Sequence, residues 1–118
     1  MTSLRLTAWL LGSLLTLAGT GCSHHDPEPE VDLAPTYMRY AQTQCADKWG
    51  GASTPQQLVS VATTYLATQG ITLLSAQASQ ASPPAVCNAC TCPTGVVLTA
   101  AVAPVDVAAL QALGFTVK

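Results

Sequence analysis

The sequence predicts an α+β fold: a small two-layer sandwich in which two helices lie on a short, mainly antiparallel sheet stapled by disulfides. A capped segment at residues 54–70 has apolar residues at helical spacing, and a second such segment follows Pro104. Two strand-like segments, 71–76 and 95–102, lie between them. Four cysteines, one upstream and three clustered, are placed to cross-link the result.

Residues 1–21 read as an export signal rather than as part of the fold. Arg5 is their only charge, and the apolar run from Leu6 to Ala18 follows it. A membrane-spanning helix needs roughly 20 apolar residues, so this run is too short to span. We therefore expect it to be removed from the mature chain.

Small residues, Ala18 to Gly21, precede Cys22. This ending resembles the lipobox of bacterial lipoproteins, in which signal peptidase cuts before a cysteine that carries a diacylglycerol. Gly19 departs from the family, which usually has Leu or another aliphatic residue there. The resemblance implies lipidation of Cys22 and attachment to the lipid bilayer, since two or more acyl chains hold stably where one does not.

The resemblance also bears on location. In well-studied lipoproteins, an Asp directly after the lipidated cysteine prevents sorting to the outer membrane. Here that position is Ser23, which by analogy implies the outer membrane of the cell envelope. The alternative to lipidation is an ordinary secretory signal cleaved nearby, which would leave Cys22 as a free or paired thiol.

The charge of the mature chain excludes one class of partner. Without residues 1–21 it has three basic residues (Arg39, Lys48 and Lys118) against six acidic ones, a formal charge of −3. Nucleic-acid binding needs a basic footprint that displaces counterions from phosphates. We therefore expect no nucleic-acid partner and no attraction to an anionic membrane surface.

Residues 22–35 are rich in proline and acid and poor in apolar residues, a composition that predicts a flexible acidic tether. Its adjacent His24 and His25 would point apart, so we interpret them as part of a solvated spacer rather than as metal ligands. A single folded domain then occupies residues 36–118.

The first part of that domain is ambiguous. The apolar positions of residues 36–45 fit neither the helical nor the strand period, so either structure is open. Trp49 is the mature chain's only tryptophan and lies near Cys45. We expect its ring to cover a disulfide; an exposed ring would instead indicate a binding platform.

The clearest helix spans residues 54–70. Thr54 suits the N-cap, Pro55 the first helical position, and Gln57 completes a capping box. An apolar stripe follows, and Gly70 supplies a left-handed stop. The stripe consists of Leu58, Ala62, Tyr65 and Leu66.

Two strands and a second helix complete the domain. Residues 71–76 and 95–102 predict strands, and the small, polar, proline-bearing segment 77–85 predicts an exposed loop between them. The second helix begins at Pro104 and ends at Gly114, with an apolar stripe of Val107, Leu110 and Leu113. Residues 115–118 would form a short edge strand.

The central motif is Cys87-Asn-Ala-Cys90-Thr-Cys92, ending in a turn-forming Pro-Thr-Gly. Bridging Cys90 to Cys92 is disfavoured because only one residue separates them. Two pairings stay open: Cys87 with Cys90 and Cys45 with Cys92, or Cys87 with Cys92 and Cys45 with Cys90. Both pairings tie the loop that holds Trp49 to the cluster. Closing the long loop from Cys45 to the cluster would stabilise the fold by about 4 kcal/mol in the chain-entropy model. Structural disulfides are expected because an exported protein lies where they persist.

Two other uses of the sulfurs compete with structural bridges. Cys45, Cys87, Cys90 and Cys92 could form a tetrahedral zinc site or a soft copper(I) site, although the second Cys-x-x-Cys of a strong zinc motif is missing. A redox pair of Cys87 and Cys90 would need a helix N-terminus to lower the thiol pKa. The cluster leads into a strand instead.

The sequence offers little for catalysis. The histidines lie in the tether, and Asp47 and Asp106, the only acids of the folded part, have no recognisable partner. A Ser/His/Asp or paired-carboxylate mechanism therefore lacks its groups. A glycine-rich phosphate loop is absent too. We expect no enzyme and no resident cofactor.

The motifs around Cys45–Gly50 and Cys87–Gly95 together resemble those of small exported bacterial lipoproteins of unknown function. The resemblance covers about half of the mature chain and implies a shared fold and cysteine pattern. The sequence thus predicts a lipid-anchored envelope protein acting as a binding or structural module. The alternative is an extracytoplasmic protein that binds zinc or copper through the cysteine cluster.

Overall fold

The computed structural model describes residues 33–118. The expected signal peptide, Cys22 and nearly all of the expected tether lie outside the described residues. The elements are β1 (Thr36–Thr43), α1 (Pro55–Thr68), β2 (Leu73–Gln80), β3 (Pro93–Val102), a 3₁₀ turn η1 (Pro104–Asp106), α2 (Val107–Ala112) and β4 (Thr116–Val117).

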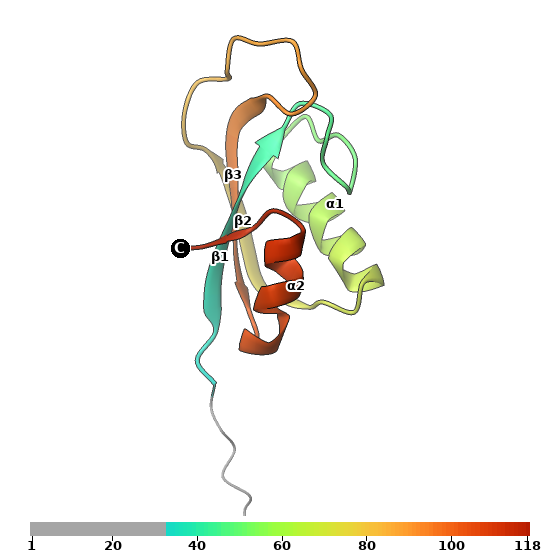
Figure 1. Ribbon diagram of the computed structural model, residues 1–118, viewed down its shortest axis with the longest axis vertical. Coiled ribbons are helices and arrows are strands. Elements are labelled where there is room, and N and C mark those ends of the chain that lie inside the picture. Colours follow the sequence, from blue (N-terminus) through green and yellow to red (C-terminus); the bar gives the residue numbers. More distant parts are fainter. Residues whose placement is uncertain (1–32) are drawn as a thin grey trace, which may run out of the picture. The chain divides into compact units, whose positions relative to one another are not determined.

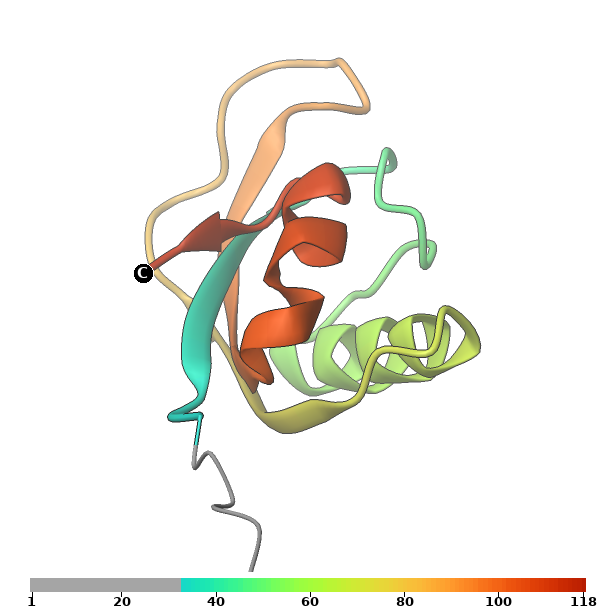
Figure 2. The ribbon, with the colours of Figure 1, turned by 60° about the horizontal axis from the view of Figure 1, so that its bottom comes forward.

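The four strands form one antiparallel sheet in the order β2-β3-β1-β4. Both helices lie on the same side of it, as Figures 1 and 2 show together. Since β3 lies between β1 and β2, the β1-α1-β2 unit is split by the returning strand. This is the connectivity of the ferredoxin-like split β-α-β arrangement. The predicted α+β sandwich is confirmed.

Strand β1 settles the ambiguity at the start of the domain. Its side chains alternate, with Met38, Tyr40 and Gln42 buried and Tyr37 and Arg39 exposed. The strand pairs with β3 along almost its whole length. The alternation therefore appears in the burial of the side chains, although apolar and polar residues do not alternate in the sequence of this segment.

Helix α1 forms as predicted. The Thr54 hydroxyl accepts a hydrogen bond from the Gln57 backbone N–H at 3.1 Å. The Gln57 side chain accepts in turn from the backbone N–H of Ser53 at 2.8 Å, one residue before the usual partner. Gly70 has a φ of 78°, which permits the left-handed stop. Leu58, Ala62 and Leu66 are buried, and Tyr65 is half-buried.

Three boundaries differ from the prediction. Residues 71–72 were expected in the first strand, but β2 begins at Leu73. Residues 77–80 were expected in a loop but belong to β2, because their pairing with β3 outweighs their weak strand propensity. The Pro-Thr-Gly after the cluster was expected as a turn but begins β3. Gly95 keeps a φ of 85° there and accepts from the backbone N–H groups of Ala81 and Ser82.

The second helix begins as the single 3₁₀ turn η1 and continues as α2. Leu110 is fully buried, Val107 and Leu113 are half-buried, and Gly114 has a φ of 97°. Strand β4 is the predicted edge strand and pairs with β1 at Met38 and Arg39. Within residues 33–118, no helix is long and apolar enough to cross a bilayer.

The core lies between the sheet and the two helices. At one end Tyr40, Trp49 and Phe115 pack their rings together, with the Tyr40 and Trp49 centroids 4.6 Å apart in an edge-to-face arrangement. The expectation that Trp49 covers a disulfide is wrong. Its ring closes the aromatic end of the core, while Cys45 and Cys90 stay exposed.

Candidate functional site

The structure selects one of the two open cysteine pairings. Cys45 is bonded to Cys90, and Cys87 is bonded to Cys92. The first bridge joins the β1–α1 loop to the β2–β3 loop, and the second closes a turn within the latter. Cys92 is buried and its sulfur accepts from the Ala89 backbone N–H at 3.3 Å, whereas the other three cysteines are exposed.

Backbone hydrogen bonds carry the β1–β3 ladder out to the first bridge. The N–H of Gln44 donates to the Cys92 carbonyl at 2.9 Å, and the N–H of Cys45 donates to the Cys90 carbonyl at 3.1 Å. The two loops therefore meet as an extension of the sheet. All four sulfurs act as structural links.

The bridges bear on the metal and redox alternatives. A metal binds cysteine as the thiolate, so a sulfur held in a bridge is not a ligand. In the part of the chain that the structure describes, no three His, Cys, Asp or Glu side chains are arranged to hold a metal ion. Cys87 and Cys90, the candidate redox pair, are bonded to other partners.

Asp47 has partners that the sequence did not reveal. Its carboxylate is buried and accepts from the Tyr40 hydroxyl at 2.7 Å, from the Thr43 backbone N–H at 3.0 Å and from the Thr43 hydroxyl. Burial, reinforced by this hydrogen bond and the Asp47 charge, raises the pKa of Tyr40 above its ordinary range. This group fixes the loop after β1, since it ties the loop's acid to two side chains of that strand.

Two buried polar atoms near this group have no hydrogen-bond partner in residues 33–118: Asp47 Oδ2 and Trp49 Nε1. Asp106, the other acid of the described region, lies at the end of η1 and is not part of the group. Within residues 33–118, the titratable side chain that is hydrogen-bonded to the Asp47 carboxylate is that of Tyr40.

A different surface has the character of a binding site. The sheet side opposite the helices is uncovered by any described element, and we call it the open face (Figure 2). Its side chains are Tyr37, Arg39 and Ala41 of β1, Ser75 and Gln77 of β2, Val97, Thr99 and Ala101 of β3, and Thr116 and Lys118 at β4.

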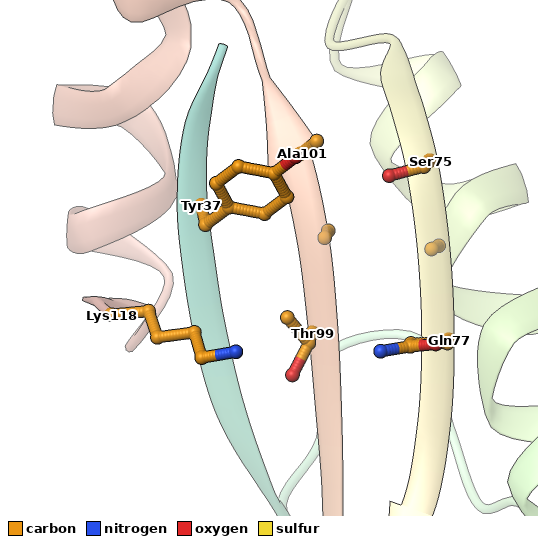
Figure 3. A pocket seen from close by; sticks show the side chains of 8 residues that line it. Tyr37, Ser75, Gln77, Thr99, Ala101 and Lys118 are labelled. Atoms are coloured by element: carbon orange, nitrogen blue, oxygen red, sulfur yellow. The ribbon is translucent and has the colours of Figure 1, made fainter.

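A hollow of about 190 Å³ lies on the open face, across β1, β3 and β2. Tyr37 pairs directly with Ala101, and its ring lies over that alanine, which is only 4% exposed (Figure 3). Tyr37 itself is 53% exposed. The ring therefore has one face against the sheet and presents the other side to solvent.

Polar side chains surround this ring. In Figure 3 the Lys118 ammonium and the Gln77 amide point toward each other across Thr99. Ser75 lies on β2, across Ala101 from the Tyr37 ring. The backbone N–H of Lys118 donates to the Tyr37 carbonyl at 2.9 Å, which fixes the base of the lysine beside β1. The hollow thus combines an aromatic floor, hydrogen-bonding groups and one cation.

The open face is electrostatically one-sided. Two of the three described basic residues lie on it, Lys118 in the first hollow and Arg39 in a second one of about 260 Å³. Asp47 and Asp106, the acids of the described region, line neither hollow. The full sequence has a formal net charge of −2, yet the charged side chains that line these two hollows are both basic.

Sequence reasoning did not single out this surface. In the sequence Tyr37 is one of several apolar positions that fit neither period, and Lys118 is one of three basic residues after residue 21. The face becomes visible once β1 is known to be a strand, because alternation then sends Tyr37 and Arg39 to the same side. Cys22, the predicted lipidation site, lies outside the described residues.

No protein-family model, curated protein or solved structure matches the chain significantly.

Proposed function

We propose that the chain is a lipid-anchored protein of the cell envelope whose domain acts by binding rather than by catalysis. The signal-like residues 1–21, the small residues before Cys22 and Ser23 after it support a lipid anchor in the outer membrane. The bridges support an oxidising compartment, where disulfides persist. They account for four of the five cysteines, and the fifth is Cys22.

The binding role rests on one observation, the exposed Tyr37 ring set among hydrogen-bonding side chains and a cation. The hollow is smaller than the roughly 300–1,000 Å³ of sites for drug-sized ligands, so it suits one small ring. We infer an acidic sugar as the ligand class. Its apolar ring face would stack on Tyr37, and its hydroxyls would bond to Ser75, Gln77 or Thr99.

Lys118 would select the acidic member of this class. A carboxylate on the sugar would form a charge-assisted hydrogen bond with the ammonium group, which is about twice as strong as a neutral one. Because the open face is exposed and shallow, we expect millimolar affinity, which corresponds to about −4 kcal/mol.

The anchor is tested by growing cells with labelled palmitate. The wild-type chain should incorporate the label and fractionate with the outer membrane. Cys22→Ala should lose both, whereas Ser23→Ala keeps the label. A labelled Cys22→Ala chain, or an unlabelled wild type, contradicts the anchor.

The binding site is tested by titrating the ¹⁵N-labelled mature chain with glucuronic acid and, as a neutral control, glucose. Signals of β1, β2 and β3 around Tyr37 should shift. Tyr37→Ala should weaken binding of both sugars roughly tenfold, a change of about 1.4 kcal/mol. Lys118→Gln should weaken binding of the acid selectively. Val105→Ala, at an exposed position on η1, is the matched control. Shifts confined to other surfaces, or none, refute this site.

A further inference from the structure

Strand β2 forms one edge of the sheet and has an outer side that no described strand pairs with. Its eight residues contain neither a charge nor a proline. Its pairing with β3 shifts register between Leu73 and Ser75, so the strand is regular from Ser75 onward. Natural edge strands normally carry such features, since an unprotected edge is a template for another strand. The opposite edge differs, because β4 has only two residues and Lys118 follows it.

The sequence of β2 is self-complementary. Residues 75–79 read Ser-Ala-Gln-Ala-Ser, a palindrome about Gln77. In an antiparallel pair centred on Gln77, Gln77 would meet its own copy, Ser75 would meet Ser79, and Ala76 would meet Ala78. Residues directly opposite each other in such a pair are close enough to interact, so the same small side chains would face each other on both sides of the sheet.

An apolar groove adjoins the centre of this palindrome. It measures about 330 Å³ and is lined by Pro55, Gln56 and Val59 of α1 and by Ala76, Gln77 and Ala78 of β2. Its position is significant because Gln77 would lie on the two-fold axis. The grooves of two copies would meet there, with Pro55 and Val59 of each facing the partner's α1 and β2.

We propose that the β2 edge is a homodimer interface, at which two copies of this chain pair antiparallel about Gln77. The two sheets would become one eight-stranded sheet. The axis would stand perpendicular to that sheet, so both open faces would lie on the same side. This inference goes beyond the proposed sugar binding and does not depend on it.

The register makes the proposal testable with charges, since Ser75 and Ser79 are exposed in the single copy. In S75K/S79K each new lysine would meet a lysine of the partner. In S75K/S79E each lysine would meet a glutamate. Both variants carry two charges on the same positions, so a general effect on folding would affect both.

The measurement is sedimentation equilibrium on the mature chain, residues 22–118, with Cys22→Ala so that acyl chains cannot drive association. We expect a concentration-dependent dimer, a dissociation constant raised at least about tenfold in S75K/S79K, and recovery in S75K/S79E. A chain that stays monomeric at millimolar concentration overturns the proposal. A dimer whose dissociation constant is unchanged in S75K/S79K also overturns it. The same holds if S75K/S79E raises the dissociation constant as much as S75K/S79K does, because the strands would then pair in a different register.

Discussion

Cys45, two residues beyond β1, is bonded to Cys90 in the β2–β3 loop, and the backbone of the same two residues is joined by a 3.1 Å hydrogen bond. The bridge closes a segment of sequence separation 45 that contains α1 and β2. The bridge between Cys87 and Cys92 spans a separation of only 5. The first bridge therefore restricts the unfolded chain far more than the second.

Removing the two bridges should have unequal effects. In the chain-entropy model, Cys45→Ala with Cys90→Ala should lower the free energy of unfolding by about 4 kcal/mol, and Cys87→Ala with Cys92→Ala by about 2 kcal/mol. Urea unfolding of both double variants and the wild type measures the difference. Equal losses, or a larger loss for the short bridge, would show that the long loop is not the main constraint.

Gly95 should resist substitution. A Cβ there would collide with the backbone carbonyl oxygens of Ser82 and Pro83, and its φ of 85° is unfavourable for other residues. Gly95→Ala should lower the free energy of unfolding by about 2 kcal/mol or more, since the left-handed conformation alone costs roughly 1–2 kcal/mol. Gly51→Ala, with open space around the glycine, is the control and should change little. Similar melting curves for the two variants would contradict this account of β3.

Stability should fall at high pH because of Tyr40. Its pKa is raised by burial and by the hydrogen bond to Asp47, from an ordinary value of 10.0. The unfolded chain therefore releases this proton before the folded chain does, so the contribution is complete below pH 10.0 and is lost as the pH rises above it.

Urea unfolding at about pH 9 and about pH 11 tests this, with Tyr40→Phe as the comparison. The wild type should lose more stability between the two pH values than the variant. At neutral pH the variant should itself be less stable by about 2 kcal/mol, since it leaves a buried carboxylate short of a donor. Tyr37→Phe removes an exposed hydroxyl and should behave like the wild type. If the free energy of unfolding falls equally with pH in wild type and Tyr40→Phe, the pKa of Tyr40 is not raised in the folded chain.

Much of the fold could be predicted because its signals are local. Thr54, Pro55 and Gly70 bound α1 through capping and glycine chemistry, and Pro104 and Gly114 do the same for the second helix. The cysteine spacing left only two pairings. The choice between them depends on how the β1–α1 loop meets the β2–β3 loop, which is a tertiary property.

The candidate site could not be predicted from the sequence, because it too depends on tertiary structure. Asp47 lies only seven residues from Tyr40, but nothing in that spacing reveals that the chain turns to bury the acid against the strand. The hollow around Tyr37 gathers residues from three strands and Lys118, which follows β4 and reaches the hollow because β4 pairs with β1. The extent of β2 was likewise set by β3 rather than by its own residues.

The most direct measurement of the central claim is the intact mass of the protein extracted from membranes, taken with and without reduction and alkylation. We predict a chain that begins at Cys22, carries acyl chains, is lighter by four hydrogens than its reduced form and takes up alkylating reagent only after reduction. A chain that retains residues 1–21, or one with four thiols that alkylate without reduction and a bound zinc or copper ion, would contradict the account.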